Sequence, residues 1–188
     1  HPGAIFICFV CQKIDCCETI RLFTGGTFEI MKIDVYPHIL PPKYKEILLK
    51  KGQDAFRQSD WLIYLDALPT LWDLDKRFRL MDRFDGYAQV LTLASPAIET
   101  VFDPKDVIDV ARMANDEMAE LVVKYPDRFP AAVAMVSLQD MDAALKETQR
   151  AVQDLHLRGI MLVTPRYGGS ISVTKPLDTP DLMPLYEM

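Results

Sequence analysis

Short apolar runs alternate with amphipathic segments along the chain from residue 32 onward. Three of these runs, Ala88–Leu93, Ala131–Leu138 and Ile160–Thr164, are almost continuously apolar and have the length of a strand. Ile33–Val35 predicts a further short strand ahead of them. Continuous rather than alternating apolar strands are typical of a parallel sheet that is buried on both faces.

The segments between these strands have helical periodicity. The longest predicted helix lies within Pro104–Phe129, with Asp106 as a candidate N-cap and Pro126 as its end. Its apolar residues form one stripe: Val107, Val110, Ala111, Ala114, Met118, Leu121 and Val122. The other predicted helices are residues 74–84, terminated at Gly86, residues 140–158, which stop before Gly159, and a helix that begins near Pro180.

Strands that alternate with helices predict an α/β fold built from βα units. A doubly wound sheet and a (β/α)8 TIM barrel both match this order of elements. Two observations favour the barrel. The segment Tyr36–Pro42 after the first strand contains no glycine, so the phosphate-binding fingerprint of a dinucleotide fold is absent there. Polar residues also gather just after the strand ends, where a barrel has its active site.

Two segments do not fit the βα pattern. Residues 41–74 are rich in proline and aromatic residues and are too long for a simple turn, which predicts an insertion after the first strand that carries its own hairpin. Residues 1–30 precede the first methionine, Met31, and the first strand follows that methionine at once. We therefore expect residues 1–30 to be an appended leader and residues 31–188 to hold the βα units.

All four cysteines of the chain, Cys8, Cys11, Cys16 and Cys17, lie in this leader. The spacing of Cys8 and Cys11 is that of a zinc knuckle, whereas the second pair is adjacent and leaves no room for a knuckle turn. A cysteine-rich zinc module therefore stays an alternative to a leader without function. The absence of cysteine from the remaining sequence argues against a disulfide-built fold and favours a reducing, cytoplasmic compartment.

Composition excludes other classes of protein. The chain has 188 residues, of which 49% are hydrophobic and 26% charged, and this is ordinary for a globular protein. Its formal net charge of −6 argues against a nucleic-acid-binding surface. No apolar run reaches the roughly 20 residues that a membrane-spanning helix needs, so we expect no membrane segment.

Several segments together resemble one known family. They are "IDVYPHILPPKY", "LWDLDKRFRLMDRFDGYAQVLTLASP", "ANDEMAELVVKYPDRFPAAVAMVSLQDMDAALKETQRAV", "LRGIMLV" and "KPLDTPDLMPLYE". Their combination resembles the amidohydrolase-related superfamily, and within it the branch of aminocarboxymuconate-semialdehyde decarboxylases and aromatic-acid decarboxylases. The resemblance runs from about residue 31 to residue 188 and corresponds to the N-terminal half of such a protein.

The resemblance implies a (β/α)8 barrel, which typically needs about 250 residues, so this chain would hold about the first four βα units of an incomplete barrel. It also implies a divalent metal, usually zinc, that is bound first by a His-x-His pair at the end of the first strand. His38 matches the second histidine of that pair, and Tyr36 occupies the position of the first. Because a phenol with a pKa near 10 is a poor zinc ligand, the metal could be absent from this chain.

The decarboxylase branch implies a small carboxylic acid as substrate. Arg57, after the first strand, and Arg166, after the strand Ile160–Thr164, are candidate contacts for its carboxylate. His156 lies late in a predicted helix, at the end that feeds the next strand, and this is the wrong end of a barrel for a metal ligand.

The favoured activity is therefore metal-dependent decarboxylation of an unsaturated or aromatic carboxylic acid. We expect that activity to be impaired in the 188-residue chain because of Tyr36 and the missing strands. The alternatives are a metal-dependent hydrolase of the same family, or a non-catalytic truncated pseudo-enzyme. Two half barrels pairing their open edges would make a homo-oligomer.

Overall fold

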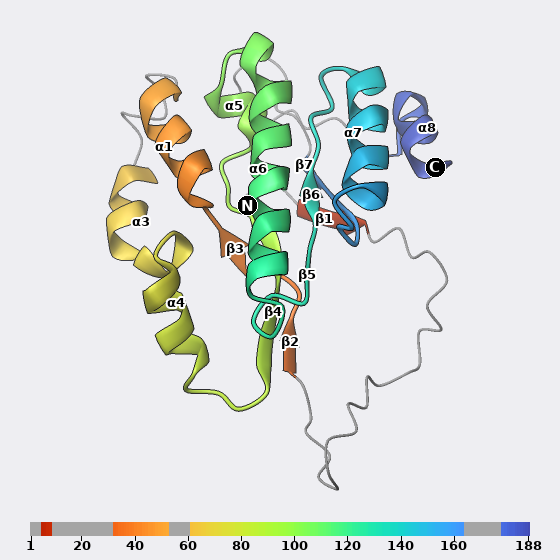
Figure 1. Ribbon diagram of the computed structural model, residues 1–188. Coiled ribbons are helices and arrows are strands. Elements are labelled where there is room, and N and C mark those ends of the chain that lie inside the picture. Colours follow the sequence, from red (N-terminus) through yellow and green to blue (C-terminus); the bar gives the residue numbers. More distant parts are fainter. Residues whose placement is uncertain (1–4, 9–31, 53–60, 164–177) are drawn as a thin grey trace, which may run out of the picture.

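The computed structural model describes residues 5–8, 32–52, 61–163 and 178–188 (Figure 1). Its strands are β1 (Ile5–Cys8), β2 (Lys32–Asp34), β3 (His38–Ile39), β4 (Tyr87–Leu93), β5 (Ala131–Ala132), β6 (Ala134–Met135) and β7 (Ile160–Val163). Its helices are α1 (Pro42–Lys51), α3 (Trp61–Ala67), α4 (Leu74–Met81), α5 (Ile98–Val101), α6 (Pro104–Lys124), α7 (Met141–Gln153) and α8 (Met183–Tyr186), with the 3-10 turns η1 (Pro69–Leu71) and η3 (Pro180–Leu182).

The long strand β4 is the centre of a parallel arrangement. It pairs in parallel with β2, β3 and β5. Only Val133 separates β5 from β6, and β6 pairs in parallel with β7. The predicted parallel order of strands is therefore confirmed. On the far side of β7, β1 from the predicted leader adds an antiparallel strand, with Ile5 opposite Val163. The strands of the described residues do not close into a barrel.

The helices α6 and α7 cover one face of these strands (Figure 1). The helix α6 contacts β5 and β6 as well as α1, α5 and α7, so it is the main link between the layers. Its predicted apolar stripe is buried from Val107 to Leu121, and Val122 is partly buried against the core. The helix ends at Lys124, two residues before Pro126, as that proline predicts.

The prediction of a hairpin within residues 41–74 is wrong for the part that the structure describes, which is helical. Pro42 occupies the first turn of α1, where a missing N–H costs nothing. Tyr44 and Leu48 lie one turn apart on the buried face of this helix. The carboxylate of Glu117 from α6 then accepts the N–H groups of Lys43 at 2.8 Å and Tyr44 at 3.0 Å. A distant carboxylate therefore caps α1, and local sequence does not show it.

Three smaller predictions also need correction. The N-cap of α6 is Asp103, and Asp106 lies in the first turn, 3.5 Å from the ammonium of Lys51. The helix α4 ends at Met81, and Gly86, with φ of 66°, serves the later turn into β4. The expected strand 131–138 consists of the two short strands β5 and β6. In the described residues, no helix is long and apolar enough to cross a membrane.

Candidate active site at the carboxyl end of the strands

The candidate metal ligand His38 begins the short strand β3, directly opposite Thr92 of β4. Its Nδ1 lies 3.1 Å from the hydroxyl oxygen of Thr92. The ring of Tyr36 packs edge-on against the imidazole, with 4.6 Å between the ring centroids. Tyr36 and His38, the two residues that the resemblance singles out, therefore lie side by side, and Thr92 contacts the imidazole of His38.

A turn between β2 and β3 sets this arrangement. The backbone N–H of Tyr36 donates to Oδ1 of Asp34 at 3.0 Å, which interrupts the first strand after Asp34. The other carboxylate oxygen of Asp34 accepts the Tyr87 hydroxyl at 2.7 Å. Asp34 is half-buried, and both of these contacts are structural. The carboxylate thus shapes the turn that precedes His38.

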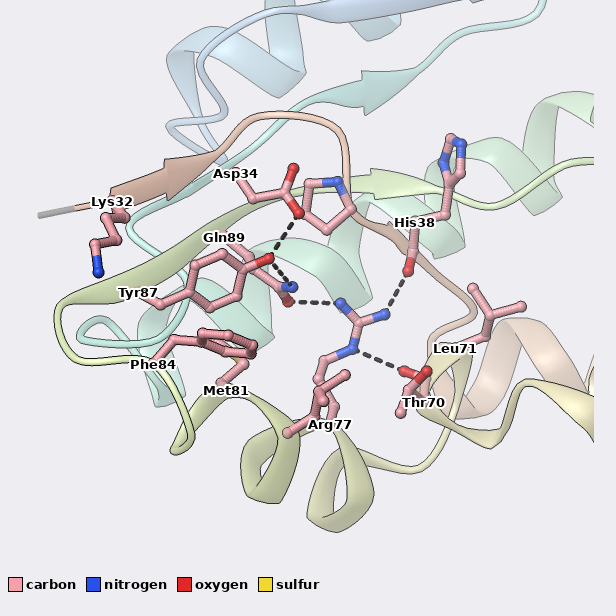
Figure 2. Close-up of a pocket in the computed structure, with 12 residues that line it drawn as sticks. Lys32, Asp34, His38, Thr70, Leu71, Arg77, Met81, Phe84, Tyr87 and Gln89 are labelled. Carbon is pink, nitrogen blue, oxygen red and sulfur yellow. Dashed lines mark hydrogen bonds between the residues drawn. The ribbon is translucent and has the colours of Figure 1, made fainter.

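Arg77 of α4 holds the backbone of His38 from the opposite side. Its Nη2 donates to the carbonyl of His38, its Nε to the carbonyl of Thr70 at 2.9 Å, and its Nη1 to the side chain of Gln89 at 2.7 Å. The side chain is only 5% exposed, and this burial lowers the pKa of Arg77 to about 10. Figure 2 shows the imidazole of His38 directed away from the guanidinium.

The two sides of β4 therefore have different roles. Gln89 and Thr92 are three residues apart along a strand, so their side chains point to opposite faces. Gln89 faces Arg77 and α4, whereas Thr92 faces the imidazole of His38. The imidazole consequently lies on the face of the sheet that is opposite to α4.

A cavity of about 440 Å3 lies on the Arg77 side, and Figure 2 shows its lining. Its polar residues include Lys32 and Tyr87, which are the first residues of β2 and β4. The cavity therefore reaches the amino ends of the strands, whereas barrel enzymes place their chemistry at the carboxyl ends. His38 also lines this cavity, but its imidazole is directed away from the guanidinium of Arg77, so we assign the candidate active site to the imidazole side of His38.

Burial acts on both aromatic groups of the candidate site. It lowers the pKa of His38, and the nearby Arg77 lowers it too, against opposing effects of the Leu93 carbonyl and of Asp34. Burial raises the pKa of Tyr36. At neutral pH the site therefore presents a neutral imidazole, which can bind a metal, and a neutral phenol, which binds metals poorly.

The described residues do not make a complete metal site. Among them, no group of three or more histidine, cysteine, aspartate or glutamate side chains is placed to hold an ion. A catalytic zinc site usually has about three protein ligands and an open position. In the part of the chain that the structure describes, His38 is thus one ligand without a second and a third.

The other predicted site residues are not among the contacts described around His38. Arg57 and Arg166 fall outside the described residues, as do Cys11, Cys16 and Cys17. His156 is exposed and lies between α7 and β7, with φ of 56°. It precedes the amino end of β7, which is the end opposite to the candidate active site. This position agrees with the prediction that His156 is not a metal ligand.

The sequence did not single out Glu99, which lies on α5 just after β4. The carboxylate of Glu99 hydrogen-bonds to the hydroxyl of Ser137 and accepts the N–H of Leu138 at 3.4 Å, so it ties together the segments that follow β4 and β6. Its Oε2 is buried and has no hydrogen-bond partner among the described residues, and neither has the buried hydroxyl of Tyr44. The sequence feature that could have indicated Glu99 is its position as a polar residue shortly after the end of β4.

We expect Glu99→Gln to remove a pH dependence of stability. Burial raises the pKa of Glu99, so the folded state holds this proton more tightly than the unfolded state does. The stabilisation is therefore complete below the unfolded pKa and is lost as the pH rises through the folded pKa.

Urea unfolding from about pH 4 to about pH 8 should show a decline in stability in the wild type that is smaller in Glu99→Gln. Glu46→Gln, at an exposed position of α1, is the matched control. Equal pH profiles for the wild type and Glu99→Gln would contradict the expectation.

The chain belongs to the amidohydrolase family, whose model matches residues 33–188. It is 27% identical over 169 residues to the 2-amino-3-carboxymuconate-6-semialdehyde decarboxylase of Dictyostelium discoideum. The aligned region covers 84% of this chain and 45% of that protein. The predicted family is confirmed, and its members that are similar to this chain include decarboxylases.

Two solved structures are similar to the chain in both sequence and fold. A 2,6-dihydroxybenzoate decarboxylase in complex with 2,6-dihydroxybenzoate is 33% identical, with a TM-score of 0.63 over 84% of this chain and 46% of that chain. A dihydroxybenzoic acid decarboxylase from Polaromonas sp. JS666, with bound manganese and the inhibitor 2-nitroresorcinol, is 29% identical, with the same TM-score and coverages of 84% and 45%. This chain spans less than half of the length of each of these proteins.

Proposed function

We propose that residues 31–188 form about the first four βα units of a (β/α)8 barrel that decarboxylates an aromatic or unsaturated carboxylic acid. The observation that supports this most directly is His38. Its imidazole lies at the carboxyl end of a parallel strand, on the sheet face away from α4, in a chain that belongs to the amidohydrolase family.

A divalent metal is part of this proposal, and His38 would be one of its ligands. Manganese is bound in one of the similar decarboxylases, whereas zinc for this chain stays a prediction. The remaining ligands would come from outside the described residues, which hold no further cluster of suitable side chains. Tyr36 lies beside His38 as a neutral phenol and packs edge-on against the imidazole.

Arg57 and Arg166 stay candidate contacts for the substrate carboxylate. A guanidinium binds a carboxylate through two parallel hydrogen bonds, which would orient the acid group to be lost. The substrate bound to one similar enzyme, 2,6-dihydroxybenzoate, supports an aromatic acid as the first compound to test. Hydrolysis in place of decarboxylation is the second candidate, since the family as a whole is named for amide hydrolysis.

We further propose that the 188-residue chain by itself is impaired, because Tyr36 replaces one expected ligand and the described residues offer only His38. The alternative function is then that of a non-catalytic truncated pseudo-enzyme. Assembly with a second copy stays a prediction, and a monomer at micromolar concentration would contradict it.

Metal content tests the proposal. Wild type, Tyr36→His, and His38→Ala in both backgrounds are incubated with Mn2+ or Zn2+, dialysed and assayed by elemental analysis and by release of carbon dioxide from 2,6-dihydroxybenzoate. We expect the wild type to hold less than one equivalent, Tyr36→His to hold more, and His38→Ala to lose metal in both. Metal content that does not depend on His38 would refute the proposed site.

A further inference from the structure

We propose that Thr92 is a positioning residue that fixes the tautomer of His38, with the proton on Nδ1 and the lone pair on Nε2. The use of that lone pair in catalysis rests on the proposed function. The tautomer itself rests on contacts within the described residues and can be measured without any metal.

The argument starts from the single proton of the Thr92 hydroxyl. Its Oγ1 lies 3.1 Å from the carbonyl oxygen of Pro37 and 3.1 Å from Nδ1 of His38. A carbonyl oxygen can only accept, so the contact with Pro37 requires the hydroxyl proton. The hydroxyl oxygen is then an acceptor toward His38, and Nδ1 must be the nitrogen that carries a proton.

The opposite arrangement leaves one contact unmade. If Thr92 donated to Nδ1, its oxygen would face the Pro37 oxygen at 3.1 Å with no hydrogen between them. Thr92 is 0% exposed and Pro37 is buried, so solvent offers these atoms little compensation. The backbone N–H of Thr92 would still satisfy the Pro37 carbonyl, but the lone pairs of the two oxygens would repel each other at this distance. The Nδ1–H tautomer satisfies both contacts of the Thr92 hydroxyl, and the carbonyl of Leu93 is a further acceptor beside the ring.

The backbone around these residues is fixed by a bond between the strands and by a side chain from α4. The N–H of Thr92 also donates to the Pro37 carbonyl, at 3.3 Å, which keeps the hydroxyl in register with the ring. Arg77 holds the carbonyl of His38 from the α4 side. The backbone that carries the imidazole is therefore fixed relative to Thr92.

The consequence is a defined role for Nε2, the ring nitrogen of His38 that Thr92 does not contact. With Nδ1–H engaged by Thr92, Nε2 carries the lone pair that can bind a cation or accept a proton. A hydrogen bond to one ring nitrogen commonly sets the function of the other in metal-binding histidines. Thr92 would fill that role here through a neutral hydroxyl in place of a carboxylate.

Nitrogen NMR of the full chain tests this directly. The wild type, Thr92→Val and Thr92→Ser are labelled with 15N-histidine and studied with a chelator at about pH 8, where a neutral imidazole is expected. Two-bond proton–nitrogen correlations then distinguish Nδ1–H from Nε2–H. His38→Gln assigns the resonance, and the exposed His156 is an internal reference.

We expect Nδ1–H in the wild type and in Thr92→Ser, and an exchange of the two nitrogen shifts in Thr92→Val, which keeps the shape of threonine without its hydroxyl. Nε2–H in the wild type, or Nδ1–H retained in Thr92→Val, would overturn the proposal. If Thr92→Val does not fold, the wild type and Thr92→Ser still decide. A confirmed tautomer together with metal content independent of His38 would refute the proposed function and leave this inference standing.

Discussion

Arg77→Met should lower the free energy of unfolding by about 3 kcal/mol, since each buried acceptor left without its partner costs about 1–3 kcal/mol. Three acceptors lose their donor: the carbonyls of Thr70 and His38 and the side chain of Gln89. Part of this loss is offset because Met avoids the cost of burying a charge, which the lowered pKa of Arg77 reveals.

Arg77→Lys distinguishes the contribution of the three guanidinium N–H donors from that of the positive charge alone. An ammonium on a flexible stem cannot reach three separated acceptors, so lysine should recover only a minor part of the loss. Arg79→Met is the control, since Arg79 is exposed on the same helix. Urea unfolding followed by far-ultraviolet circular dichroism measures all three. If Arg77→Met cost no more than Arg79→Met, the guanidinium would not be what fixes the backbone at His38.

The parallel arrangement could be predicted because its signal is carried by consecutive residues. Ala88–Leu93 is mostly apolar, and β4 covers it with Tyr87 added. The stripe of α6 follows from helical spacing alone, and so does its burial. The interruption of the first strand is different, because it depends on a bond between Asp34 and the backbone of Tyr36. Sequence shows an apolar strand there and not the turn that ends it.

His38 could be predicted from its place after a strand, but its supports could not. Arg77 stands among the charged residues of "DKRFRLMDR", and local sequence gives no reason to bury it rather than its neighbour Arg79. Arg77 is buried against Gln89, to which it donates a hydrogen bond. The position of Gln89 depends in turn on the pairing of β4 with the first strand. Thr92 is likewise one polar residue in an apolar run until the register places it opposite His38.

The capping of α1 shows the same limit on a larger scale. Lys43 and Glu117 are far apart in sequence, and the carboxylate of Glu117 is 5% exposed within the apolar face of α6. A charged residue inside a buried stripe normally argues against that helix face. Here the N-terminus of α1 supplies the partner, and because that partner is distant in sequence, local residues predict a hairpin in segment 41–74 and not the helix α1.

Asn115→Leu should be the most costly substitution in the link between α6 and the sheet, at about 4 kcal/mol, since up to three buried partners lose a hydrogen bond. Asn115 is 0% exposed, and its Oδ1 accepts the N–H of Met135 at 2.8 Å. Its Nδ2 donates to the carbonyl of Met135 at 2.9 Å and to Oε1 of Glu147 at 2.8 Å. Leucine matches the shape of asparagine and makes none of these bonds.

The effect should be concentrated at β6, because this two-residue strand relies on the side chain of Asn115 for both polar groups of Met135. Glu147 keeps its two contacts with Arg150, each 2.8 Å, so α7 should remain folded. We expect the amide of Met135 to lose its protection from hydrogen exchange before the amides of β7 do. Asp109→Leu, at an exposed position of α6, is the matched control for the new side chain.

Asn115→Asp distinguishes the bond that Asn115 accepts from the bonds that it donates. An aspartate can still accept the Met135 N–H, but it has no N–H to donate and places a second carboxylate beside Glu147. It should therefore destabilise the fold as well, and more strongly at high pH than at low pH, because protonation removes the repulsion. Urea unfolding at two pH values measures this. A loss for Asn115→Leu no greater than for Asp109→Leu, or one that leaves Met135 protected, would mean that packing rather than this side chain joins α6 to the sheet.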